Sequence, residues 1–294
     1  MKHIVKPCKY DYNTNKQIIE DLIKEYPFLN VQIVGRTALG RGIFSLSMGN
    51  TKNSVIYVGA VNGCQWLTSL ILLLFTERLC HSAKHSHLLC SVDIRKAFSQ
   101  LGITVIPCLN PDGAEISVHG VKGAKSMGSF VSSFTDGDRL SWKANAMGVD
   151  INHNFGKSRQ LAQEKGIFTP SPSLFSGEYP ESEAETKAFT RLCRMVNFRQ
   201  CLSLHTGGEE ISFRHSENEP AQSSMMAKIL ACSCNYTLSE RDDGFLWGLR
   251  DWFSKEFYRP AFEIGVGTEE KPSAEKLYSI YEQIEETLTL FALM

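Results

Sequence analysis

Four polar residues follow or end segments that the sequence predicts to be buried strands: Asn62, Asn110, His205 and Glu263. Imidazole and carboxylate groups are donors from which protein metal sites are built, whereas amides are uncharged and are not among the usual donors. His205 could instead be a satisfied core histidine, and Glu263 could pair with it or with a nearby arginine. The arrangement of the strands decides whether these groups meet.

Apolar strands alternate with amphipathic helices along the chain. We expect helices over residues 15–26, 66–80, 182–196 and 273–291, and strands over residues 31–35, 43–47, 54–61, 103–109, 200–204 and 260–264. This order predicts an α/β fold: one domain (1–294) with a mixed, mostly parallel twisted sheet, helices on both faces, and residues 1–50 integral to it. Ligands of such sheets bind beyond the carboxyl ends of the strands, so the four polar residues should converge there.

Local motifs predict how three elements begin. Asn-Pro-Asp-Gly at residues 110–113 is a strong turn sequence, in which Asp112 should stabilise the turn. The segment Ser182–Glu185 has the pattern of a capping box that opens the next helix. Asn62 and Gln65 have the same spacing, with Asn at a favoured N-cap position and Gln three residues later. A capping box would therefore explain both amides without any role in chemistry.

Composition limits the possible partners. The net charge of −1 offers no general attraction for nucleic acid or anionic lipid. The longest apolar run, Leu70–Phe75, is far shorter than the roughly 20 residues that span a bilayer. The first residues lack a secretory signal pattern, and the nine cysteines are an odd number typical of reduced thiols. We therefore expect a cytoplasmic protein whose partner is neither nucleic acid nor membrane.

Four segments together resemble the zinc carboxypeptidase family. They are VGAVNGCQWLTS (58–69), GVDINHNF (148–155), SLHTGGEEI (203–211) and RPAFEIGVG (259–267). In family order, they resemble the His-x-x-Glu ligand segment, the substrate-carboxylate segment, the strand of the third ligand and the strand of the catalytic glutamate. The resemblance runs from about residue 26 to the C-terminus. The residues that follow His205 and those around Asn110 are most similar to the bacterial branch of the family. That branch cleaves γ-D-glutamyl–diamino acid bonds of cell-wall peptides.

The resemblance implies a hydrolytic mechanism. In the family, two His and one Glu hold zinc and leave a fourth position for water or a substrate carbonyl. The metal acidifies the water, and a carboxylate acts as general base. His205 matches the last zinc ligand and Glu263 matches the catalytic base.

The resemblance also places the substrate, which we expect to be a peptide of the murein type. Asn152 and His153 match the residues that bind its terminal carboxylate. A neutral His153 would hold a carboxylate less firmly than a bidentate arginine. Of Glu209 and Glu210, one should cap a turn and the other should line the pocket wall, and we assign Glu210 to the substrate side.

Two of the three expected zinc ligands are replaced. Asn62 stands where the first His belongs, and Gln65 stands where the Glu belongs. Loss of a group that only orients a ligand already costs about 10–100-fold in metal affinity or activity, so loss of two ligands should cost more. Cys64 could supply a compensating thiolate, although a small residue in a helix-entry loop explains it better. The strand before Glu263 is also about two residues shorter than the family pattern.

Three hypotheses follow. The first, which we favour, is a family member that keeps the pocket, binds cell-wall-type peptides and has little or no hydrolytic activity. The second is an active metallopeptidase that recruits Cys64 or a distant histidine. The third is an interaction protein in which the old pocket is closed.

Overall fold

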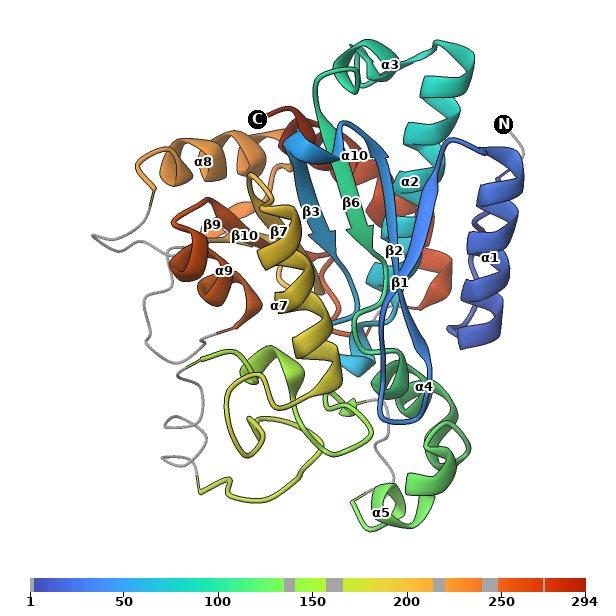
Figure 1. The fold of residues 1–294 in the computed structure, drawn as a ribbon, viewed down its shortest axis with the longest axis vertical. Coiled ribbons are helices and arrows are strands. Elements are labelled where there is room, and N and C mark those ends of the chain that lie inside the picture. Colours follow the sequence, from blue (N-terminus) through green and yellow to red (C-terminus); the bar gives the residue numbers. More distant parts are fainter. Residues whose placement is uncertain (1–2, 135–140, 157–165, 214–219, 240–247, 272) are drawn as a thin grey trace.

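A computed structural model describes residues 3–134, 141–156, 166–213, 220–239, 248–271 and 273–294 of the chain (Figure 1). An eight-stranded sheet with the order β1-β2-β6-β3-β7-β10-β8-β9 forms its centre. The strands are β1 (Asn30–Arg36), β2 (Gly42–Gly49), β3 (Ser54–Val58), β6 (Gly102–Ile106), β7 (Cys201–Thr206), β8 (Glu210–Ser212), β9 (Thr237–Ser239) and β10 (Ala261–Val266). β6, β3, β7 and β10 are parallel neighbours, and antiparallel pairs flank them. The predicted mixed, mostly parallel sheet is confirmed.

Helices cover both faces of this sheet. The covering helices are α1 (Tyr12–Glu25), α2 (Leu67–His85), α7 (Ala184–Val196), α8 (Ser223–Cys234), α9 (Leu249–Phe257) and α10 (Leu277–Leu293). The shorter helices α3 (Ile94–Ala97), α4 (Pro111–His119) and α5 (Gly128–Ser132) lie beyond the strand ends, and a small ribbon pairs β4 (Leu88–Leu89) with β5 (Val92–Asp93). Figure 1 shows α7 and α9 on the face opposite α2 and α10. Within the described part of the chain, each helix is too short or too polar to cross a bilayer.

The apolar run of β3 serves both layers. Val55 and Tyr57 pack in a core cluster with α1, α2, α8 and α10, whereas Ile56 and Val58 pack in a second cluster with α7 and α9. Successive side chains of a strand point to opposite faces, so a strand covered on both sides must be apolar throughout. This arrangement fixes the carboxyl end of β3, where the chain turns toward Asn62.

Two of the predicted local motifs are wrong. The segment 110–113 begins α4 and is not a free turn: the Asn110 Oδ1 accepts from the Gly113 N–H at 2.9 Å, with Pro at the start of the helix. The capping box at the start of α7 does not form either. Glu183 is the N-cap without a side-chain cap bond, and its backbone N–H donates to Asn154 Oδ1 at 3.1 Å. At the start of α7, the distant Asn154 therefore provides a side-chain acceptor in place of the predicted capping box.

Candidate functional site

A polar cavity of about 340 Å³ lies beyond β3 and along the carboxyl-terminal parts of β7 and β10. It is lined by Asn62, Gln65, Lys143, Asp150, Asn152, His153, Ser173, Leu174, His205, Thr206, Gly207, Glu210, Ser212, Arg250, Glu263 and Gly265. All seven site residues proposed from the sequence are among them. They come from segments up to 201 positions apart (residues 62 to 263), so the fold brings them together as the strand order requires.

The loop that carries both amides is held rigidly after β3. The Ala60 N–H donates to Thr68 Oγ1 at 2.7 Å, and the same hydroxyl donates to the Gln65 carbonyl at 2.8 Å. At Gly63 a Cβ atom would lie 2.5 Å from the backbone carbonyl of Gly113, so only glycine fits between these segments. This wall of the pocket is therefore preformed.

The predicted capping box between the two amides does not exist. Asn62 makes no side-chain cap bond to the short 3₁₀ turn Gly63–Gln65, and its buried Oδ1 has no hydrogen-bond partner among the described residues. The Gln65 side chain reaches across the pocket, where its Oε1 lies 2.8 Å from His205 Nδ1. His205, which is 140 positions away in the sequence, thus binds the Gln65 amide that the capping box would have used.

His205 lies between Gln65 and Glu263. The amide oxygen of Gln65 can only accept, so His205 Nδ1 carries the proton of this hydrogen bond. The other ring nitrogen, Nε2, is 3.5 Å from Glu263 Oε2, which is longer than a charge-assisted hydrogen bond. His205 is 5% exposed, whereas the Glu263 side chain is 31% exposed and faces the pocket opening. Glu263 therefore lies beside the histidine, one of the neighbours expected from the sequence, without a hydrogen bond to its Nε2.

Another part of the pocket wall carries His153 and Arg250. His153 lies in the short turn Ile151–His153, with its Nε2 3.9 Å from Asp150 Oδ2. The buried Arg250 donates to Ser212 Oγ at 3.0 Å and to Asp251 Oδ1 at 3.0 Å. The guanidinium gives this part of the cavity a positive charge, and the imidazole can add an N–H donor for a ligand carboxylate.

Asn152 and Glu210 occupy different parts of the pocket wall. Asn152 Oδ1 accepts from the Leu249 N–H at 3.1 Å, so this side chain also supports the start of α9. Glu210 begins β8 and lines the cavity, whereas Glu209 lies in the preceding turn with φ of +44°. The order of the two glutamates agrees with the assignment of Glu210 to the substrate side.

Sequence reasoning missed one cationic residue of the pocket, Lys143, and considered Arg250 only as a partner of Glu263. Lys143 Nζ lies 2.8 Å from Glu270 Oε1. Desolvation opposes the charged form of Lys143, but this partner raises its pKa above the usual value. Lysine is common on surfaces, so its position carries no signal by itself.

Two polar residues of the predicted strand ends serve the scaffold instead. Asn110 was expected at the site, but its Nδ2 donates to the carbonyls of Val61 at 3.2 Å and Ala144 at 3.1 Å. Asp112 was expected to stabilise a turn, but it is fully buried and pairs with Arg41 at 2.7 Å. Both residues fix the loops behind the pocket wall.

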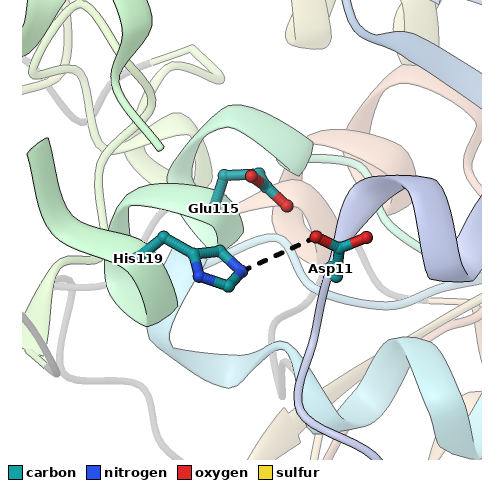
Figure 2. Close-up of side chains that lie close together, drawn as sticks. All are labelled: Asp11, Glu115 and His119. Atoms are coloured by element: carbon teal, nitrogen blue, oxygen red, sulfur yellow. Dashed lines mark ion pairs between the residues drawn. The ribbon is translucent and has the colours of Figure 1, made fainter. Parts of the chain in front are cut away.

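A second group of ligand-type side chains lies outside the pocket. Asp11, Glu115 and His119 place one ligand atom each within 4.8 Å of one another (Figure 2). Each already has a structural partner in the described chain: Asp11 caps α1, Glu115 lies 3.3 Å from Arg41, and His119 Nε2 lies 3.1 Å from the Tyr10 carbonyl. The adjacent guanidinium also opposes a second cation, so we assign this cluster to the docking of α1 on α4.

Comparison with known proteins decides the family. A model of the zinc carboxypeptidase family matches residues 16–252. The chain belongs to the zinc carboxypeptidase family. It is 26% identical over 270 residues to gamma-D-glutamyl-L-diamino acid endopeptidase 1 of Lysinibacillus sphaericus, covering 90% of this chain and 68% of that protein.

Solved structures of zinc carboxypeptidase-type proteins share the fold. Thrombin activatable fibrinolysis inhibitor has a TM-score of 0.76 at 14% identity, over 97% of this chain and 73% of that one. The murein-tripeptide amidase MpaA of Escherichia coli O157 has a TM-score of 0.53 at 16% identity, over 87% and 92% of the two chains. The protein is therefore zinc carboxypeptidase-like, similar in sequence to a gamma-D-glutamyl-L-diamino acid endopeptidase and similar in fold to a murein-tripeptide amidase.

The donor atoms of this family member fit a hydrogen-bonded site better than a zinc site. Two ligand atoms bound tetrahedrally to one zinc ion lie about 3.3 Å apart, because each is about 2.0–2.1 Å from the metal. Gln65 Oε1 and His205 Nδ1 are 2.8 Å apart and share a proton. Cys64 is buried and is not among the residues that line the cavity, and burial raises the pKa of its thiol to about 12.

Proposed function

We propose that this protein binds a peptide of the murein type in its pocket and does not hydrolyse it through zinc. The observation that carries the proposal is the 2.8 Å hydrogen bond between Gln65 and His205. This bond engages the Gln65 amide oxygen and one ring nitrogen of His205, and Asn62 offers only a neutral amide beside them.

The size of the cavity and its other lining residues support binding of a peptide. The cavity of about 340 Å³ is within the range that accommodates small ligands, and this supports an open pocket over a filled one. His153 and Arg250 suit a ligand carboxylate, as proposed for Asn152 and His153 from the sequence. We infer the class of peptide from the similar endopeptidase, because its name specifies a γ-D-glutamyl–diamino acid substrate.

An active enzyme with a recruited thiolate has less support. Cys64 is buried with its pKa raised to about 12, first by desolvation. The nine cysteines are free thiols, and this supports the cytoplasmic location that we propose. Glu263 then serves as a binding residue, not as a base, in the proposed function.

Titration calorimetry and a hydrolysis assay with γ-D-glutamyl-meso-diaminopimelate test this function. We expect saturable binding and no cleavage, with or without added zinc. His153→Ala should weaken binding about 10-fold, because a hydrogen bond to a charged group is lost. His87→Ala, on the exposed segment after α2, is the matched control and should leave affinity unchanged. Zinc-dependent cleavage that disappears in Glu263→Gln would overturn the proposal, as would the absence of binding.

A further inference from the structure

Three hydrogen-bond acceptors meet the pocket at the position that the family uses for its metal. They are Asn62 Oδ1, His205 Nε2 and the carboxylate of Glu263. Among the described residues, Asn62 Oδ1 and His205 Nε2 are buried and have no hydrogen-bond partner. The two residues are 7% and 5% exposed, so bulk water does not satisfy them freely.

The proton on His205 Nδ1 decides which ring nitrogen can accept. His205 Nδ1 donates to Gln65, so a neutral ring presents the lone pair of Nε2. Nε2 lies 3.5 Å from Glu263 Oε2, which is an acceptor when ionised. Neighbouring acceptors without a donor are unfavourable, because a buried polar group without a partner costs free energy.

A primary ammonium group matches this arrangement. It carries three N–H donors and one positive charge, so it can serve several acceptors at once and neutralise the carboxylate. A hydroxyl or a single amide N–H would satisfy one acceptor and leave the charge of Glu263 without a counterion. Zinc would find one imidazole nitrogen, one carboxylate and a neutral amide among these three side chains, and amides are not among its usual ligands.

We propose that a primary ammonium group of the bound peptide occupies the position of the family's metal and donates to Asn62, His205 and Glu263. This inference rests on the proposed function, because it specifies which part of a peptide ligand enters the pocket. The part of the pocket wall formed by His153 and Arg250 then receives a carboxylate of the same ligand. The pocket thus selects peptides or amino acids that carry both a free amine and a carboxylate.

The test compares two ligands by titration calorimetry: γ-D-glutamyl-meso-diaminopimelate with free amines, and the same dipeptide with its amines acetylated. We expect acetylation to weaken binding at least about 10-fold, as loss of a charge-assisted contact does. Equal affinity for both ligands would overturn the ammonium site and leave the proposed function standing. Binding of neither ligand would overturn both.

Variants locate the contact. Glu263→Gln keeps the shape of the side chain and should weaken only the free-amine ligand, again at least about 10-fold. Glu209→Gln removes the same charge from the turn just outside the cavity and serves as the matched control. Asn62→Leu, with thermal unfolding as a check of folding, should also weaken only the free-amine ligand. An unchanged affinity in both pocket variants would contradict the assignment.

Discussion

Asn62→His combined with Gln65→Glu should turn the pocket into a zinc site. The two changes supply the imidazole and carboxylate that the donor set lacks, and His205 already lies 2.8 Å from the side chain at position 65. The loop that carries positions 62 and 65 should keep its conformation, because Thr68 and Gly63 hold it in place. Each restored ligand should contribute more than the about 10–100-fold attributed to an orienting partner, so the double variant should gain well over about 100-fold in zinc affinity.

Competition with a chelator of known affinity measures this gain, and thermal unfolding gives an independent reading. Zinc at about 1,000 times its dissociation constant would stabilise the folded double variant by about 4 kcal/mol. With an unfolding entropy near 0.6 kcal/mol/K for a chain of this size, the melting temperature should rise by about 6–7 °C. The single variants serve as controls and should respond less. A folded double variant that binds zinc no better than the natural chain would refute the reasoning.

Three other changes test the scaffold. Asp112→Asn should destabilise the protein by up to about 3 kcal/mol in urea unfolding, because it breaks a buried pair with Arg41 that Glu115 only partly replaces. Cys64→Ser should leave zinc content and peptide affinity unchanged, as expected for a thiol whose pKa is raised to about 12; a loss of metal would contradict this. Burial raises the pKa of Glu185 from 4.5 to about 8, so the folded state retains a proton that the unfolded chain releases. Stability should therefore fall between pH 4.5 and 8, and Glu185→Gln should abolish this fall in unfolding measurements at pH 5 and 8.

Periodicity predicts the scaffold well because burial acts locally on each strand. The uninterrupted apolar residues of β3 indicated a strand covered on both faces, and the two core clusters confirm it. The same logic placed His205 and Glu263 at or near strand ends, and the structure shows that their strands are neighbours, with Gly265 in register with His205. The short helix α4 was missed because Asn-Pro-Asp-Gly suits both a turn and a helix start.

Contacts between distant segments limited the prediction of the site. The spacing of Asn62 and Gln65 is that of a capping box, and no local feature indicates that His205 competes for the amide. Likewise, the N-cap of α7 is Glu183 and not Ser182, and its backbone N–H donates to the distant Asn154. The positive charge of the pocket wall beside His153 depends on Arg250, whose position follows only from the packing of α9.

Zinc stoichiometry of the natural chain is the most direct test of the central claim. The purified full chain is equilibrated with equimolar zinc, dialysed against metal-free buffer and analysed by inductively coupled plasma mass spectrometry, with the Asn62→His, Gln65→Glu variant alongside. We predict far less than one zinc per natural chain and close to one per variant chain. One tightly held zinc per natural chain, lost in His205→Ala, would contradict a pocket in which Gln65 and His205 have replaced the metal by a hydrogen bond.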